Sequence, residues 1–310
     1  MTGNRALTVL GTASQAPTRK RAAGGYALRW DDQLILFDPA EGFQRQCLLA
    51  GVPIGRATAV CITHFHGDHC LGLPGIIQRR ALSQCEAPLP VFFPAAGSDY
   101  VEHLVRSSIY DGSFLEPRPV TAPGFVADLG GSSLLCEPLA HEVPTIGYRV
   151  QEPSVRGLSE ERLHQRGLSG PIVGELIERG FLDIDGERVT VAELTEERPG
   201  QAMAFVMDTG WCNGALALAH GVDLLVCEAT YLERDRSLAG EHHLTAKQAA
   251  TLAADAGARR LVLSHFSSRY EEWAAYEQEA SAVFDDVIIA EDLIVVPVPP
   301  RERCQDPLDG

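Results

Sequence analysis

The chain has 310 residues, 45% of them hydrophobic, which is enough apolar material for a sizeable core in one or two domains. Its formal net charge is −16, from 42 acidic and 26 basic residues. This balance excludes a protein that coats nucleic acid non-specifically, because attraction to phosphate comes from Lys and Arg. Only two basic residues are lysines, Lys20 and Lys247, so any nucleic-acid partner has to be met by a local patch rich in arginine.

The eight cysteines are scattered along the chain, and no two form a Cys-x-x-Cys pair. Several lie in apolar, strand-like segments, as buried free thiols do. This usage is typical of a reducing compartment and predicts a cytoplasmic protein. The first residues, Met1 to Arg5, hold no apolar signal core, and no apolar run reaches about 18 residues. Neither a signal peptide nor a membrane span is therefore expected.

Short strands dominate the first third of the chain. Apolar runs predict strands at 6–10, 25–30, 33–37 and 57–63. Helical spacing predicts helices at 42–50 and at 71–82, the second beginning near Pro74. The strand at 57–63 leads directly into the segment Thr63-His64-Phe65-His66-Gly67-Asp68-His69.

The rest of the chain alternates between strands and helices. Strands are expected at 90–93, 133–139, 147–150, 202–207, 222–227 and 260–264. Helices are expected at 100–108, 214–220 and 245–256, with Thr245 as the cap of the last one. Such alternation predicts an α/β layered fold. Polar residues repeatedly follow the strand ends, where α/β folds place their chemistry: His141, Asp208, Glu228 and His265.

Residues 151–200 interrupt this pattern. They are rich in charge and turns and hold eleven Asp or Glu, six Arg and no Lys, a net charge of −5. Two short helices and a hairpin near Asp185-Gly186 are expected. We interpret the segment as an inserted subdomain or arm of a single domain that spans residues 1–310.

The His-rich segment points to metal chemistry. Imidazole nitrogen and carboxylate oxygen are the ligands that suit Zn²⁺, and Mn²⁺ less tightly. His64, His66, Asp68 and His69 lie too close together to reach one ion tetrahedrally from a short loop, which favours two adjacent metals. Ligands from the strand ends, His141, Asp208 and His265, would complete both sites. The alternative is a solvated loop that happens to be rich in histidine, and so dense a pattern after a buried strand is rarely accidental.

His-x-His-x-Asp-His is also the signature of the metallo-β-lactamase superfamily, whose fold is an α/β, αββα sandwich. Seven segments resemble, in order, those of one of its members, the ribonuclease Z family of tRNA 3′-processing endonucleases: Leu10 to Thr18, Phe37 to Gln46, His141 with Gly147-Tyr148-Arg149, Asp208-Thr209-Gly210, Cys227-Glu228-Ala229-Thr230, His243-Leu244-Thr245, and Ser264 to Tyr270. Phe43, Cys227 and Leu244 depart from the family pattern, which has Thr, His and Ser there.

The resemblance implies a ligand set for two Zn²⁺ per subunit. In it, His64, His66 and His141 bind one metal and Asp68, His69 and His265 bind the other. Asp208 bridges them, with a hydroxide between the two metals that attacks the phosphodiester. Asp68 would also orient or deprotonate this nucleophile.

The resemblance also implies a catalytic pair, in which Glu228 holds His243 and His243 protonates the leaving oxygen. Glu228 could instead be a salt-bridged strand-end carboxylate. The neighbouring His242 is an equally good chemical candidate, and only the spacing to Thr245 selects His243.

The family implies an arm that grips tRNA and a homodimer in which one subunit's arm holds the tRNA cut by the other. Here the arm at 151–200 is acidic, so a dimer contact or a solvated flap is the alternative reading of it. Better candidates for phosphate binding are Arg19-Lys20-Arg21, Arg79-Arg80 and Arg269, though each could be an ordinary surface charge.

Three functions compete. The leading hypothesis is a zinc-dependent endoribonuclease that removes the 3′ trailer from precursor tRNA and leaves a 3′-hydroxyl. The alternative is a small-molecule phosphodiesterase, arylsulfatase or lactonase on the same scaffold, which the acidic charge favours. A non-catalytic RNA- or protein-binding member is the third, and the intact ligand set argues against it.

Overall fold

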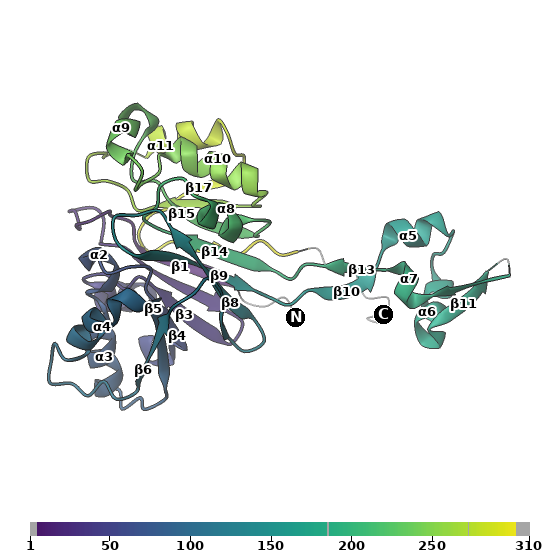
Figure 1. Ribbon diagram of the computed structural model, residues 1–310, viewed down its shortest axis with the longest axis horizontal. Coiled ribbons are helices and arrows are strands. Elements are labelled where there is room, and N and C mark those ends of the chain that lie inside the picture. Colours follow the sequence, from purple (N-terminus) through teal and green to yellow (C-terminus); the bar gives the residue numbers. More distant parts are fainter. Residues whose placement is uncertain (1–4, 185, 272, 302–310) are drawn as a thin grey trace. The chain divides into compact units, whose positions relative to one another are not determined.

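Two seven-stranded sheets pack face to face in the computed structural model, which describes residues 5–184, 186–271 and 273–301. Figure 1 shows α3 and α4 on one side of the two sheets and α8, α10 and α11 on the other. The four layers confirm the predicted α/β sandwich, because each sheet buries one face against the other sheet and one against helices.

The first sheet has the order β18-β1-β2-β3-β4-β5-β6, antiparallel from β18 to β3 and parallel from β3 to β6. Its strands are β1 (Ala6–Gly11), β2 (Gly25–Trp30), β3 (Gln33–Phe37), β4 (Ala59–Cys61), β5 (Leu89–Pro94), β6 (Leu115–Val120) and β18 (Val295–Pro297). The helical segments between them are α1 (Phe43–Ala50), η1 (Ile54–Arg56), α2 (Gly67–Cys70), α3 (Leu73–Leu82), η2 (Ala95–Gly97) and α4 (Ser98–Val105).

The second sheet has the order β17-β16-β15-β14-β9-β8-β7, parallel from β17 to β14 and antiparallel from β14 to β7. Its strands are β7 (Gly124–Asp128), β8 (Ser133–Leu139), β9 (Thr145–Gln151), β14 (Ala202–Val206), β15 (Leu224–Glu228), β16 (Leu261–Ser264) and β17 (Val287–Ile289). The helical segments are α8 (Asn213–Ala219), η3 (Glu233–Asp235), α9 (Arg236–Ala239), α10 (Ala246–Ala256) and α11 (Ala274–Ser281).

Aromatic side chains join the two sheets. Phe37 from β3 stacks on Phe205 from β14, with ring centroids 4.8 Å apart, and Tyr26 meets the same ring edge-on at 4.9 Å. Tyr148 from β9 is fully buried and donates its hydroxyl to the carbonyl of Ile62, next to the His-rich segment. This packing fixes the register of the strands whose ends carry the candidate ligands.

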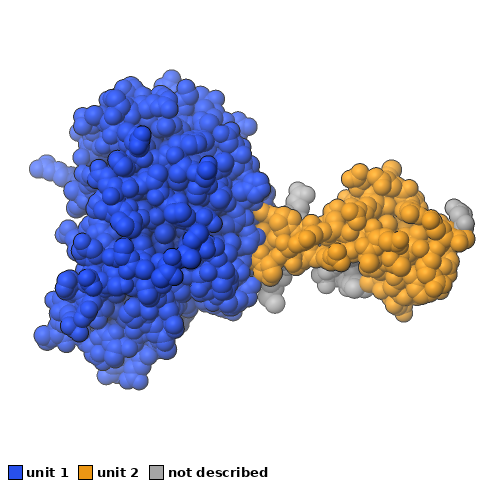
Figure 2. Space-filling view, viewed as in Figure 1, with its two compact units in different colours: residues 1–151, 202–300 blue, residues 152–201, 301–310 orange. Residues whose placement is uncertain are grey.

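The described residues of the segment 152–201 form a second compact unit together with Arg301, orange in Figure 2. Its elements are β10 (Val155–Leu158), α5 (Glu160–Gln165), α6 (Pro171–Arg179), β11 (Phe181–Ile184), β12 (Glu187–Thr190), α7 (Val191–Leu194) and β13 (Thr195–Arg198). Leu176, Val189 and Leu194 form part of its own small core. The predicted hairpin is β11–β12, and Asp185 in its turn lies outside the described residues.

The predicted strands and helices of the two sheets are present with shifted bounds, whereas β6, β7, α9, α11, β17 and β18 were not predicted. The expected loop after the strand at 57–63 is partly helical, because α2 places Asp68 and His69 on a single helical turn. No helix among the described residues is long and apolar enough to cross a membrane. The seven cysteines within the described ranges are all free, and Cys304 lies outside them.

Candidate metal centre

The polar side chains that follow the strand ends meet at one edge of the two sheets. β4 leads to His64 and His66, while the second sheet delivers Asp208 after β14 and His265 after β16. All seven candidate ligands fall into groups whose donor atoms lie within 4.8 Å of one another: His64, His66 and His141 with Asp208, and Asp68 and His69 with His265. The structure therefore brings together every ligand that the sequence singled out.

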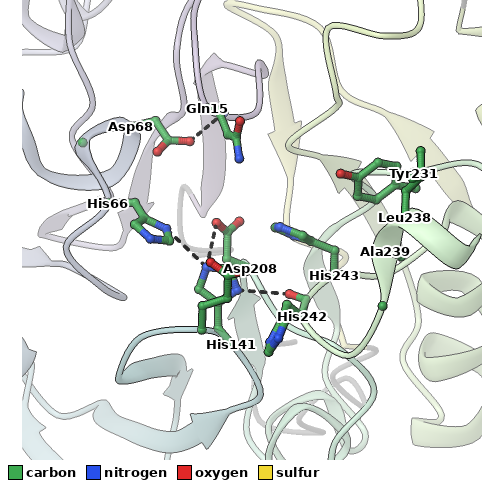
Figure 3. A pocket seen from close by; sticks show the side chains of 13 residues that line it. Gln15, His66, Asp68, His141, Asp208, Tyr231, Leu238, Ala239, His242 and His243 are labelled. Carbon is green, nitrogen blue, oxygen red and sulfur yellow. Dashed lines mark hydrogen bonds and ion pairs between the residues drawn. The ribbon is translucent and has the colours of Figure 1, made fainter.

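A pocket of about 450 Å³ opens over these groups. In Figure 3, His66, Asp68, His141 and Asp208 surround it from one side, and His243 faces them from the other. Small molecules and a backbone phosphate could both reach the donor atoms through this opening, so the pocket alone does not select the substrate.

The first group holds three imidazoles in close contact. His66 Nδ1 lies 3.0 Å from His64 Nε2 and 3.3 Å from His141 Nε2. Burial, followed by the charge of His69, lowers the pKa of His64 to about 4, so its ring is neutral and can donate a lone pair. Three ring nitrogens this close together can all bind one ion placed between them.

The second group contains buried atoms without hydrogen bonds. Nε2 of His69 and Nε2 of His265 are buried and form none among the described residues. Both face the same carboxylate oxygen, Asp68 Oδ2, at 3.4 and 3.5 Å. Because buried polar atoms rarely go unpaired, such atoms indicate that this group binds a ligand such as a metal ion.

Asp208 lies between the two groups. Its Oδ2 is 3.4 Å from His64 Nε2 and 3.3 Å from His69 Nε2, so one oxygen faces both. Donor atoms bound about 2.0–2.1 Å from a tetrahedral Zn²⁺ lie roughly 3.3–3.4 Å from one another. The spacing and the nitrogen-oxygen chemistry both fit such an ion, and the chain therefore has a metal-binding site.

The metal-facing nitrogens are oriented by hydrogen bonds on the opposite side of each ring. Asp38 Oδ2 accepts from His69 Nδ1 at 2.8 Å and from the Thr63 hydroxyl at 2.7 Å. Thr63 in turn accepts from His64 Nδ1 at 3.0 Å. The buried Asp38 therefore sets the orientation of one histidine in each group and leaves Nε2 of both free to bind.

Two of the other three candidate histidines are held in the same way. His141 Nδ1 donates to the carbonyl of His242 at 3.1 Å, and His265 Nδ1 lies 3.0 Å from the Thr230 hydroxyl. The backbone N–H of Gln15 donates to Asp68 Oδ2 at 2.7 Å. These partners fix the donor atoms before any ion binds.

Three residues of this site hold a left-handed backbone conformation without being glycine. Asp38, Asp208 and His265 have φ values of 43°, 47° and 60°, and each follows the end of a strand. Such residues cost roughly 1–3 kcal/mol each and persist where the surrounding structure enforces them. The conformation turns each side chain from the strand direction into the site.

Glu228 and His243 form a pair beside the donor groups. His243 Nδ1 lies 3.0 Å from Glu228 Oε1, and Glu228 is fully buried. Burial lowers the pKa of His243, but the charge and hydrogen bond of Glu228 raise it above its usual value, which favours the protonated ring. The neighbouring His242 makes no such contact and contributes its carbonyl to His141, so the structure pairs Glu228 with His243.

Close approach of two chain segments places this pair. A Cβ atom on Gly210 would lie 2.0 Å from the carbonyl oxygen of Glu241, so only glycine lets the 241–243 segment lie against Asp208-Thr209-Gly210. Glu228 also accepts from the N–H of Thr209 at 2.6 Å, which ties the pair to the same segment.

Four residues orient the candidate ligands although the sequence predicted no role for them: Asp38, Thr63, Thr230 and Gln15. Asp38 directly follows β3, next to the strand that leads to His64 and His66. A carboxylate at this strand end could have been predicted to lie near the histidines. Thr63 and Thr230 act through hydroxyl groups. Threonine is common in strands, so its presence in the sequence does not indicate a role at a site.

Two of the arginines expected to bind phosphate, Arg21 and Arg80, are buried and bound within the protein. Arg80 is buried and donates to the carbonyls of Gly55 and Ala57. Arg21 is also buried, stacks on Trp273 with its Cζ 3.8 Å from the ring centroid, and donates to the carbonyl of Tyr270. The remaining candidates are exposed: Arg19, Lys20, Arg79 and Arg269.

Family models match two long stretches of the chain, which together cover most of the unit formed by residues 5–151 and 202–300 (the main unit). Residues 26–145 match the metallo-beta-lactamase superfamily, and residues 179–266 match a beta-lactamase superfamily domain. Ribonuclease Z from Salinispora arenicola is 50% identical over 300 residues, covering 96% of this chain and 97% of that protein. Ribonuclease Z from Nocardia farcinica is 49% identical, covering 96% and 99%.

Solved structures share the fold. The crystal structure of human tRNase Z, short form, aligns with a TM-score of 0.65 and 24% identity, covering 95% of this chain and 100% of that one. A long-form RNase Z from yeast aligns with a TM-score of 0.69 and 13% identity, covering 96% of this chain and 42% of that one. At these identities, the structures show the fold alone.

Proposed function

This chain belongs to the ribonuclease Z family, and from that premise we propose that it is a zinc-dependent endoribonuclease that removes the 3′ trailer from precursor tRNA. The observation that carries the proposal is the pair of buried Glu228 and partly buried His243, 3.0 Å apart and beside two donor groups with Asp208 between them. A phosphodiester that is cut to leave a 3′-hydroxyl needs a proton donor for that oxygen, and this pair supplies one.

The donor groups suit two ions, for which we propose Zn²⁺, with Mn²⁺ as the alternative. His64, His66 and His141 would hold one ion, and Asp68, His69 and His265 the other, with Asp208 shared by both. When bound, such ions lower the pKa of water and relieve negative charge on the phosphoryl oxygens.

Asp68 and His243 are the residues that handle protons in this proposal. Asp68 lines the pocket, and its Oδ2 is fixed by the N–H of Gln15, so the carboxylate can orient the attacking water and accept its proton. His243 lies across the pocket and uses Nδ1 to bind Glu228, which leaves Nε2 to protonate the departing 3′-oxygen. A positioned general acid of this kind contributes about 10²–10⁴-fold to the rate.

We further propose a homodimer in which the 152–201 unit of one subunit holds the tRNA cut by the other. Support comes from exposed leucines on and beside the neighbouring helices α1 and α3, because apolar side chains on a surface are typical of subunit contacts. They are Leu48, Leu49 and Leu71, with 75%, 52% and 53% of their surface exposed.

A cytoplasmic location is part of the same proposal. The seven free cysteines within the described ranges support it, because thiols stay reduced in the cytosol.

One assay separates the competing functions. The zinc-loaded protein is incubated with a precursor tRNA and, separately, with bis-p-nitrophenyl phosphate. We expect a single cut at the 3′ end of the tRNA, with a 3′-hydroxyl on the product, and Asp208→Ala as the inactive control. Cleavage of the small ester but not of the tRNA would support a small-molecule phosphodiesterase, and cleavage of neither would support a non-catalytic member.

A further inference from the structure

One wall of the pocket is apolar and takes no part in the chemistry described so far. It is formed by the chain around η3 and α9, and its exposed side chains are Tyr231 and Leu238. Leu238 has 49% of its surface exposed, and Tyr231 is partly exposed. Figure 3 shows both on the side of His243 that faces away from Asp208. Apolar groups at the mouth of an otherwise polar site indicate a ligand with an apolar face.

The wall is held rigidly. The N–H of Tyr231 donates to the carbonyl of Leu244 at 3.2 Å, and the carbonyl of Tyr231 accepts from Ala246 at 2.9 Å. Thr245 caps α10 and donates its hydroxyl to Glu233 Oε2 at 2.7 Å, which joins η3 to the same helix. These bonds fix the backbone that carries the Tyr231 ring, so little backbone freedom is lost when a flat ligand stacks there.

The position of the wall relative to His243 limits what can lie on it. The rings of Tyr231 and His243 are 5.9 Å apart at an interplanar angle of 63°. If His243 protonates the departing 3′-oxygen, the nucleoside that carries this oxygen extends to the His243 side of the pocket. Its ribose and base then meet Tyr231 and Leu238, while the nucleotide on the other side of the cut does not.

We propose that Tyr231 and Leu238 bind the nucleoside immediately 5′ of the cut, with its base stacked on the Tyr231 ring and its ribose against Leu238. This rests on the proposed function, since it requires His243 to act on a 3′-oxygen. Every base has a flat face, so the surface accepts any of the four nucleotides. The enzyme therefore needs no particular base at the last position of its product.

The test compares two substrates and three variants. One substrate is a precursor tRNA, and the other is the same RNA with an abasic residue immediately 5′ of the cut. The variants are Tyr231→Ala, Tyr231→Phe and, as the matched control, Phe125→Ala, an exposed aromatic residue on β7 that does not line the pocket. Metal content and melting temperature are measured for each variant.

With the normal substrate, Tyr231→Ala should raise KM about 5- to 150-fold, the effect of losing one base stacked on an aromatic ring. The abasic residue should raise KM by the same factor for the wild type and for Tyr231→Phe. It should leave the KM of Tyr231→Ala unchanged. An equal loss from the abasic residue in Tyr231→Ala and in wild type would overturn the proposal. Wild type that leaves both RNAs uncut would instead refute the proposed function.

Discussion

Replacing Asp38 by Asn should weaken metal binding although Asp38 is not itself a candidate ligand. Its Oδ2 accepts from the Thr63 hydroxyl at 2.7 Å and from His69 Nδ1 at 2.8 Å, while Oδ1 accepts from the N–H of Thr63 at 2.7 Å. If the amide oxygen of Asn keeps the bond to the backbone, its NH₂ group meets two donors. His69 then turns or changes tautomer, and its Nε2 no longer faces Asp68 and Asp208.

Loss of a partner of this kind costs about 10- to 100-fold in metal affinity, roughly 1.4–2.7 kcal/mol. The affinity is measured by competing the protein with a chelating zinc indicator, which requires no activity. Asp223→Asn is the matched control, because Asp223 is equally buried and accepts from the N–H of Ala202 and from Arg259, away from the donor groups. Unchanged zinc affinity in Asp38→Asn, or an equal loss in the control, would refute the reasoning.

Three further outcomes are expected. His243→Ala should slow RNA cleavage about 10²–10⁴-fold while zinc content, read by atomic absorption, stays unchanged, and lost zinc would mean that His243 is a ligand. Removal of metal by EDTA should abolish cleavage and lower the melting temperature, because an ion that binds the donor groups of the folded chain alone stabilises the fold; an unchanged melting temperature would contradict this. Joining Gln151 to Ala202 by a short Gly-Ser turn should preserve hydrolysis of the small ester and raise KM for precursor tRNA, since these two residues already pair across β9 and β14. An unchanged KM would exclude a role of the 152–201 unit in binding.

The ligand set could be predicted from the sequence because its residues are few in type and dense in spacing. His64, His66, Asp68 and His69 lie within six residues after an apolar strand, and His141 and His265 follow strands of their own. The carboxyl ends of parallel strands meet at one edge of a sheet, so side chains that are distant in sequence converge there without any further information.

The orientation of these ligands could not be predicted in the same way. Asp38 and Thr63 act through hydrogen bonds whose geometry depends on a left-handed residue after β3 and on the pairing of β3 with β4. The choice between His242 and His243 depends on the close approach of the 241–243 segment that Gly210 permits. These are tertiary features, and neighbouring residues in the sequence look equally suitable without them.

The elements that the sequence reasoning missed are short or at sheet edges. β6 has the sequence Leu-Glu-Pro-Arg-Pro-Val, and two prolines argue against a strand. It lies at the edge of the first sheet and pairs with β5 alone. An edge strand tolerates Pro117 and Pro119, because the side of the strand without a neighbour needs no backbone N–H for pairing. α2 has four residues, fewer than an apolar period can mark.

The charges of the acidic 152–201 unit predict how strongly RNA binding depends on salt. Most of its arginines are already bound within the unit: Arg166 to Glu187, Arg179 to Glu175, Arg188 to Asp183, and Arg162 to the carbonyl of Thr195. Among the described arginines of the unit, only Arg156 has a side chain that makes no hydrogen bond or ion pair. Few cations of this unit are therefore free to bind phosphates and release their counterions. Because each neutralised phosphate adds to the salt dependence of binding, we expect this dependence to be weak.

A protein that makes six to ten phosphate contacts loses about 10³–10⁵ in affinity between 50 and 200 mM salt. With a net charge of −16 and so few free arginines, this enzyme should lose less than about tenfold in kcat/KM over the same range. The measurement is single-turnover cleavage of precursor tRNA at several salt concentrations, with the small ester as the control for salt effects on the metal centre. A steep slope on tRNA and a flat one on the ester would show that phosphate contacts dominate after all. Binding would then depend on exposed cations of the main unit, of which Arg19, Lys20 and Arg269 are the first to replace.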